Sequence, residues 1–378
     1  MNKQTAVIVI PTYNEADNVK KLTQQIFDVV KTIENWDTHI LIVDSQSPDG
    51  TAAVIREEMK KQKQLHLLET KKEGLGRAYV AGFSYAINKL SADVLFEMDA
   101  DFSHDPRALP KFLKKIDNGA DFVIGSRYIR GGSIPKDWGL NRKFYSVVGN
   151  LIIRFGFFKL SVTDWTSGFR CIKSWIIREN IGIIEKYSGY VFQVALLDNA
   201  IKKHAKVGEV PINFTDRKYG VSKINSGQFI RDALLYIAFH SSFLRYVVVG
   251  GSGFLIDFGI FTALYFGLNL PIYVAQAISA EAAIVNNFIG NNFWSFSHKK
   301  IDHKASSIVR SFFKFNAVAL GSLIMQVVAL TAYEYKFGEN HVLIFKAVFL
   351  VLIIMPYSYI LYNRVVWKSK KSPEIDVV

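Results

Sequence analysis

Only one cysteine, Cys171, occurs in the 378 residues. This excludes an internal disulfide framework and fits a chain whose soluble part stays in a reducing compartment. The start of the chain also lacks the features of a secretory signal. Met1 to Thr5 are polar, and the apolar run from Ala6 to Pro11 is too short for the apolar core of a signal peptide. We therefore expect no signal peptide.

Hydrophobic residues make up 50% of the chain, and the net charge is +13. The length allows two domains. A strongly basic protein needs a negatively charged partner, which can be nucleic acid, anionic lipid headgroups or a phosphorylated substrate. Much of the excess charge lies beside long apolar segments, so we expect a lipid bilayer and a phosphorylated substrate rather than nucleic acid.

Up to about Ser242, short apolar runs alternate with amphipathic stretches. The runs predict strands at Thr5–Ile10, His39–Val43, Leu65–Leu68, Val94–Met98 and Phe122–Ile124. Helices are predicted at Glu15–Val30, Thr51–Lys60, Leu75–Ile87 and Pro106–Ile116, the last with Asp105 as its N-cap. This alternation indicates an α/β domain with a mostly parallel sheet covered on both faces. Ligands of such sheets bind beyond the carboxyl ends of the strands.

From Phe243 onward the pattern changes to four apolar segments of about 20 residues, the length that spans a bilayer. They are Phe243–Leu268, Ile272–Phe293, Phe312–Ala332 and Val342–Tyr362. A large soluble helical domain is the alternative. Basic residues gather in the linker between the second and third segments and in the tail, so the positive-inside rule places both chain ends and the first domain in the cytosol.

Polar residues within these segments are costly in a membrane and often functional. They are Asp257, Glu281, Asn286, Asn287, Asn291 and Asn292. We favour hydrogen bonds between helices, or side chains reaching to the membrane interface, as their role. Gly250, Gly251 and Gly253 are then expected to allow close helix packing.

Polar side chains follow the first two predicted strands. Pro11 ends the first, Tyr13 offers a ring for a base or ribose, and Glu15 can accept hydrogen bonds from sugar hydroxyls. Asp44 ends the second and can accept hydrogen bonds from a base or ribose. For Asp49–Thr51 we favour a turn and helix cap over a binding role.

The fourth predicted strand leads directly into Asp99-Ala100-Asp101, with Ser103 and His104 beside it. Two carboxylates at this spacing can share a divalent cation with a diphosphate, because Mg²⁺ and Mn²⁺ prefer oxygen ligands from carboxylates and substrate phosphates. The pattern predicts a metal-dependent site for a nucleotide-activated substrate.

Basic side chains follow further along. Arg127 comes after the fifth strand, and Arg142 and Ser146 lie one helical turn apart, so they can share one phosphate. A contact with lipid headgroups is the alternative. The loop from Arg217 to Lys223 is suited to closing over a diphosphate. The stretches 150–159 and 227–245 have broad apolar faces and can lie in the membrane interface.

Seven motifs in order give the first part a resemblance to family-two glycosyltransferases, specifically the polyprenol-phosphate (dolichol-phosphate) mannose synthase branch. They are IPTYNE, Asp44 with SPDGT, MDADFSHDP, GSRY, DWTSGFR, GYVFQ and DRKYGVSK, from about Val7 to Lys223. The second part is similar to the GtrA-like four-helix membrane family through RYVVVGGSGFLIDF and NNFIGNNFWSF.

The resemblance implies a GT-A (Rossmann-like) domain over 1–226, an interfacial linker over 227–242, a four-helix transmembrane domain over 243–368 and a cytoplasmic tail over 369–378. It implies inverting transfer of a hexose, with GDP-mannose as donor and a polyprenyl or dolichyl phosphate as acceptor. Its implied donor-binding residues are Pro11, Tyr13, Glu15, Asp44, Asp99, Ala100, Arg217 and Lys223. Asp101 and Ser103 would hold Mg²⁺ or Mn²⁺, and Arg127, Arg142 and Ser146 would bind the lipid phosphate, with Asp99, Asp101 and Arg127 catalytic.

Three positions depart from the family pattern. Ser45 stands where many relatives have a second aspartate, Ala195 where an acidic residue is common, and Asn292 where the membrane family has arginine. The departure at Ser45 leaves the donor base open between guanine and uracil.

A UDP-sugar such as UDP-glucose with undecaprenyl phosphate is therefore the alternative substrate pair. A lipid-linked sugar flippase or scaffold with a degenerate transferase domain is another alternative, although intact Asp99, Asp101, Arg127 and Arg217 argue against it. A processive polysaccharide synthase would have a Gln-x-x-Arg-Trp signature, which the chain lacks.

Overall fold

The computed structural model describes residues 3–187, 191–216, 226–299, 301, 304–338 and 341–367. The chain divides into two compact units, one up to Tyr236 and one from Ile237 onward. Each unit is described by itself below.

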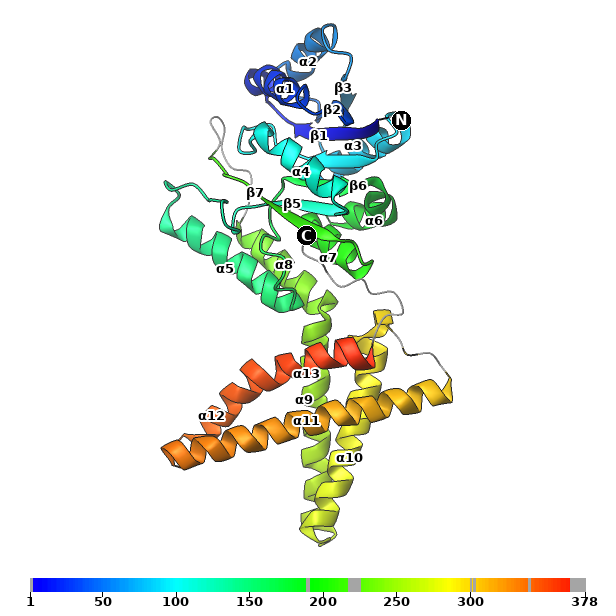
Figure 1. Cartoon of the computed structure of the whole chain (residues 1–378), viewed down its shortest axis with the longest axis vertical. Helices are drawn as coiled ribbons and strands as arrows, with labels where there is room; N and C mark the ends of the chain where they lie inside the picture. Colours follow the sequence, from blue (N-terminus) through cyan, green and yellow to red (C-terminus); the bar gives the residue numbers. More distant parts are fainter. Residues whose placement is uncertain are drawn as a thin grey trace. The chain divides into compact units, whose positions relative to one another are not determined.

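The first unit contains a seven-stranded sheet with the order β3-β2-β1-β4-β6-β5-β7 (Figure 1). The strands are β1 (Gln4–Thr12), β2 (Trp36–Asp44), β3 (Leu65–Glu69), β4 (Val94–Glu97), β5 (Phe122–Ser126), β6 (Arg170–Lys173) and β7 (Val207–Pro211). Only β6 runs antiparallel to its neighbours β4 and β5. The predicted mostly parallel sheet is confirmed.

Helices cover both faces of this sheet because both faces of its central strands are apolar. In β1, Ala6, Ile8 and Ile10 belong to the core shared with α1 (Ala16–Val30) and α4 (Leu109–Asp117). The intervening Val9 faces α3 (Leu75–Lys89), where a Cβ on Gly82 would lie 2.5 Å from the Val9 side chain. Gly82 thus lets α3 approach the sheet closely.

The remaining helices of this unit follow the strands in chain order. They are α2 (Thr51–Met59), η1 (Pro106–Ala108), α5 (Leu140–Phe157), α6 (Ser174–Lys186), α7 (Val191–Lys202) and α8 (Ser226–His240), whose last residues reach into the second unit.

Several predicted boundaries differ from the structure, among them the end of β1 and the start of α4. β1 continues past Pro11 to Thr12 in register with β2. The helix predicted from Pro106 instead begins as the 3₁₀ turn η1, capped by Asp105, before α4 starts at Leu109. Pro110 has no N–H and is tolerated only in the first turn of an α-helix, which explains the late start.

The second unit is helical. It contains α9 (Ser242–Thr262) with a π-helical turn η2 (Ala263–Gly267), α10 (Ile272–Gly290) with η3 (Asn291–Ser295), and η4 (Ser297–Lys299). α11 (Ala305–Phe337) follows, then α12 (Val342–Phe349), η5 (Leu350–Ile354), α13 (Met355–Leu361) and η6 (Tyr362–Val366).

Each of the four predicted apolar segments is thus helical. Among the described residues, two helices have the length and apolar composition to cross a membrane, Ser242–Gly267 and Ala305–Phe337, and Leu350–Val366 is a shorter apolar helix.

Two of the polar residues of the apolar segments, Asp257 and Asn286, form the expected hydrogen bonds between helices. Asp257 on α9 accepts a hydrogen bond of 2.7 Å from Ser279 on α10. Asn286 on α10 donates to Ser252 on α9 at 3.0 Å. A Cβ on Gly253 would lie 2.2 Å from the side-chain oxygen of Asn287, so this glycine allows the close packing that the sequence predicted.

Asn292, the departure from the membrane family's motif, also has a clear structural role. Its side-chain oxygen accepts a hydrogen bond of 3.0 Å from Trp367 Nε1 and one of 3.4 Å from the backbone of Ile301. The Trp367 ring stacks on Phe296. Asn292 therefore joins the end of α10 to the end of the last helix.

Candidate functional site

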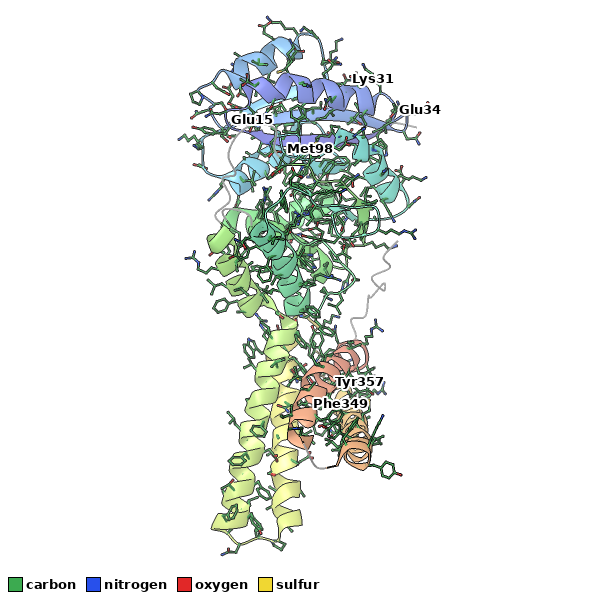
Figure 2. The ribbon with its side chains drawn as sticks, turned by 90° about the vertical axis from the view of Figure 1, so that its left-hand side faces the viewer. Glu15, Lys31, Glu34, Met98, Phe349 and Tyr357 are labelled. Carbon is green, nitrogen blue, oxygen red and sulfur yellow. The ribbon has the colours of Figure 1, made fainter. Side chains whose placement is uncertain are left out.

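The loop after β4 carries the predicted metal-binding residues. Met98, the last residue before Asp99, is completely buried in the core and anchors the loop (Figure 2). Asp101 is 6% exposed, and its Oδ1 accepts a hydrogen bond of 3.0 Å from the backbone of Ser103. The Ser103 hydroxyl is buried and has no hydrogen-bond partner among the described residues.

His104 fixes the start of this loop. Its Nδ1 accepts a hydrogen bond of 3.0 Å from the backbone N–H of Asp99, and its ring stacks on Phe169. Burial lowers the pKa of His104 to about 4, although the nearby Asp101 opposes this change. The imidazole is therefore neutral near pH 7 and serves as a structural anchor of the carboxylate loop.

The donor set fits a divalent cation that shares a diphosphate. Among the described residues, no group of three or more histidine, cysteine, aspartate or glutamate side chains could hold a metal by itself. A hard cation bound by one or two carboxylates completes its shell with substrate phosphates and water. The Ser103 hydroxyl beside Asp101, which has no hydrogen-bond partner among the described residues, could supply a further oxygen.

Asp44 lies at the end of β2 and is fully buried. Its Oδ1 accepts hydrogen bonds from Thr12 at 2.9 Å and from Ser47 Oγ at 2.6 Å, and its Oδ2 accepts one from the Ser47 backbone at 2.9 Å. Asp44 thus shapes the loop above it.

The loops after β1 and β2 are joined by side-chain bonds to successive backbone N–H groups. Asn14 donates to Ser47, Glu15 to Thr51 and Ala16 to Asp49, each at 3.0 Å. Asp49 also accepts from the backbone N–H of Thr51. The turn predicted at Asp49–Thr51 is confirmed, whereas the N-cap residue of α2 is Gly50, which has no side chain to cap the helix.

Tyr13 and Lys72 contact each other at the same edge. The Lys72 ammonium lies 3.6 Å from the centroid of the Tyr13 ring, a cation–π contact. Pro11 pairs with Val43 of β2, which places Tyr13 just beyond the end of the sheet. Sequence reasoning did not single out Lys72.

Arg127 follows β5 and is 9% exposed. Its Nε and Nη2 each donate to the Asp164 carboxylate at 2.8 Å, and Nη2 also donates to Thr166 at 2.7 Å. Burial disfavours the ionised Asp164, but the Arg127 charge and hydrogen bonds outweigh it and hold the Asp164 pKa below its usual range. Within the described residues only Nη1 makes no hydrogen bond, so it is the group left for a ligand.

Arg142 and Ser146 lie on α5, as predicted, but they have different partners. Arg142 Nη1 lies 3.0 Å from both oxygens of Asp216, and its guanidinium lies 4.0 Å from the centroid of the Trp138 ring. The Ser146 hydroxyl lies 2.7 Å from that of Tyr128. The Arg142 side chain is 46% exposed and accessible to a ligand.

Phe214, which follows β7, brings the two predicted halves of the site together. Its ring contacts His104 and Trp138, and the Arg127 guanidinium lies 5.6 Å from its centroid. The next residue, Thr215, donates to the Phe102 carbonyl oxygen at 2.9 Å. The carboxylate loop and the arginines therefore lie side by side. Arg217 and Lys223 fall outside the described residues.

Below this site lies a buried charged pair that sequence reasoning missed. Glu97 of β4 and Arg170 of β6 face each other in register, both fully buried, with Arg170 Nε 3.9 Å from Glu97. Arg170 also donates to the carbonyl oxygens of Trp165, Ser167 and Gln193. The pair thus links the strand that carries Asp99 to the loop that carries Asp164.

These features define a family-two glycosyltransferase of the GT-A fold joined to a membrane domain. Residues 7–181 match the model of glycosyl transferase family 2, and residues 245–367 match that of the GtrA/DPMS transmembrane domain.

The chain also resembles three relatives, one of them over nearly its whole length. It is 30% identical to dolichol-phosphate mannosyltransferase of Pyrococcus furiosus over 96% of this chain and 99% of the relative. It is 37% identical to polyprenol monophosphomannose synthase of Mycolicibacterium smegmatis over 62% of this chain and 86% of the relative. The undecaprenyl-phosphate mannosyltransferase of Micrococcus luteus is 37% identical over 58% of this chain and 87% of its own length. The chain belongs to the family of dolichol- and polyprenol-phosphate mannosyltransferases.

Proposed function

We propose that this protein transfers mannose from GDP-mannose to a polyprenyl or dolichyl phosphate, with inversion at the anomeric carbon. The observation that carries the proposal is the link between the carboxylate loop and the two arginines. Phe214 contacts His104 of that loop and Arg127. Thr215, which bonds to Phe102 of the loop, directly precedes Asp216, the partner of Arg142. This link supports a donor diphosphate and an acceptor phosphate bound side by side. The names of the three relatives support mannose as the sugar and a polyprenyl phosphate as the acceptor.

On the donor side, Pro11, Tyr13, Glu15, Asp44 and Ala100 would line the nucleotide, and Asp99 would contact the sugar diphosphate. Asp101 and Ser103 would hold Mg²⁺ or Mn²⁺ together with the diphosphate. When bound, the cation supplies neutralisation of the charge on the departing diphosphate. Arg217 and Lys223 would contact the same diphosphate.

On the acceptor side, the Nη1 of Arg127, together with Arg142 and Ser146, would bind the lipid phosphate. A phosphate monoester is anionic at neutral pH and attacks without a protein base. No residue then has to act as a general base, which is consistent with a neutral, buried His104 that only holds the carboxylate loop. The residues need only to align the two substrates and to screen their charges.

The exposed face of α5 supports docking of this unit on a membrane. Large apolar side chains along it are between 36% and 84% exposed: Leu140, Phe144, Tyr145, Val147, Leu151, Ile152 and Phe155. Arg142 lies on the same helix and would hold the acceptor phosphate at headgroup level. Together with the basic linker and tail, this face leads us to infer a multi-pass membrane protein with its catalytic unit in the cytosol. We propose domain boundaries at about residues 226, 242 and 368.

The test uses the purified full-length protein, Mn²⁺, a polyprenyl phosphate and one radiolabelled donor at a time. Labelled lipid formed from GDP-mannose is the expected result. Labelled lipid formed from UDP-glucose but not from GDP-mannose would show that the proposed donor is wrong. Label from neither donor, in a protein that still binds Mn²⁺ and nucleotide, would favour a lipid-linked sugar flippase or scaffold.

A further inference from the structure

Arg142, the exposed arginine of the acceptor side, already has an anionic partner. Both oxygens of the Asp216 carboxylate lie 3.0 Å from Arg142 Nη1, and the two side chains are 46% and 43% exposed. Under the guanidinium, the Trp138 ring is 7% exposed and fixes the position of the arginine.

Asp216 does not reach this position by chance movement of a long side chain. The aspartate side chain is short, and the two residues before it are held by contacts with the rest of the unit. Thr215 donates through its backbone to the Ser103 carbonyl oxygen at 3.4 Å and through its hydroxyl to that of Phe102. The Phe214 ring packs against Trp138 and His104. The segment therefore presents one carboxylate to Arg142.

We propose that Asp216 occupies, in the acceptor-free enzyme, the place on Arg142 that the acceptor's phosphate takes during the reaction. The proposal rests on the proposed function, because it takes Arg142 as a ligand of the lipid phosphate. The acceptor binds by displacing the carboxylate, so Asp216 helps to set the affinity and the charge selectivity of the acceptor site.

The relative strengths of the two anions support this exchange. An exposed ion pair is worth at most about 1 kcal/mol, roughly a fivefold change in an equilibrium constant. A phosphate monoester carries a charge of about −1.5 to −2 and three acceptor oxygens. Both anions can form bidentate hydrogen bonds with arginine, so the advantage of the phosphate is its larger charge and its third oxygen. A phosphate therefore displaces Asp216, whereas weakly charged lipids do not. Competition with Asp216 thus selects for acceptors that carry a phosphate.

The experiment compares full-length wild type with Asp216→Asn and Asp216→Ser, using farnesyl phosphate as the acceptor. Each substitution removes the competing charge, so the acceptor KM should fall by about two- to fivefold. The donor KM should stay unchanged. Inorganic phosphate, tested as an inhibitor competitive with the acceptor, should inhibit both variants about two- to fivefold more strongly.

Asp137→Asn is the matched control, since Asp137 is an exposed aspartate directly before Trp138 and its loss changes the net charge equally. Its acceptor KM should equal that of wild type. An unchanged or higher acceptor KM in both Asp216 variants overturns the proposal, as does an equal fall in Asp137→Asn. Arg142→Ala separates a failure of this proposal from a failure of the proposed function. If wild type makes lipid product and Arg142→Ala leaves the acceptor KM unchanged, the assignment of Arg142 as a phosphate ligand is wrong as well.

Discussion

The ion pair between Arg127 and Asp164 predicts a large loss of stability when one partner is removed. Asp164 is fully buried and accepts two bonds of 2.8 Å from Arg127. Asp164→Ala leaves the buried guanidinium without its counter-charge, which costs about 3–5 kcal/mol. For a domain of this size, 1 kcal/mol shifts Tm by about 2–4 °C, so Tm should fall by roughly 6–20 °C.

The assay is thermal unfolding of the full-length protein in detergent, followed by tryptophan fluorescence. Trp165 is a suitable reporter because it follows Asp164 and its ring stacks on Phe157. Asp28→Ala is the control, since Asp28 pairs with Lys31 on the surface, where an ion pair contributes about 1 kcal/mol or less. If Asp164→Ala melts within 2 °C of this control, the reasoning about the buried pair is refuted.

The same pair predicts the direction of a pH dependence. The folded-state pKa of Asp164 is depressed, so its contribution is fully present above its unfolded-state pKa, about 3.9, and is lost as pH falls further. Asp164→Asn cannot titrate, so its Tm deficit relative to wild type should shrink as pH is lowered below about 4. A constant deficit across that range would contradict the assignment.

Three further predictions concern the carboxylate loop, the pair beneath it and the membrane unit. Asp101→Ala should lose metal-dependent turnover, and full activity across a Mn²⁺ titration would show that Asp101 is not a ligand. Burial raises the pKa of Glu97 to about 7, so stability should fall as pH rises from about 4.3 to about 7, and Glu97→Gln should flatten this slope in Tm. Asn292→Leu should cost about 1–3 kcal/mol in unfolding, because Trp367 Nε1 and the Ile301 N–H lose their acceptor; an unchanged Tm would contradict this.

The sheet could be predicted because its central strands are continuous apolar runs. β1, β2, β4 and β5 lie where those runs predicted them, since burial on both faces leaves no polar alternation, and the half-buried edge strand β3 was predicted as well. β6 and β7 were not predicted. β6 has only four residues, and it buries Arg170 at its start, so its sequence resembles a polar connection.

The polar residues at the ends of the strands could also be predicted from the sequence. Asp99 and Asp101 follow a buried strand, and Asp49 lies in a turn with Gly50 before a helix, so each position carried its own local signal. The partners of the arginines were not readable. Arg127 and Asp164 lie 37 residues apart, and Arg142 and Asp216 lie 74 apart. One sequence contains no signal for such pairs, which arise only when the fold brings two loops together.

The most direct measurement of the central claim is the structure of the lipid product. The full-length protein is incubated with GDP-mannose, Mn²⁺ and a polyprenyl phosphate, and the purified product is examined by NMR. The account predicts a mannosyl phosphate ester in the β configuration, because direct attack by the phosphate inverts the α-linked donor. An α-linked product, or no mannosyl lipid from a folded protein that binds GDP-mannose, would contradict it.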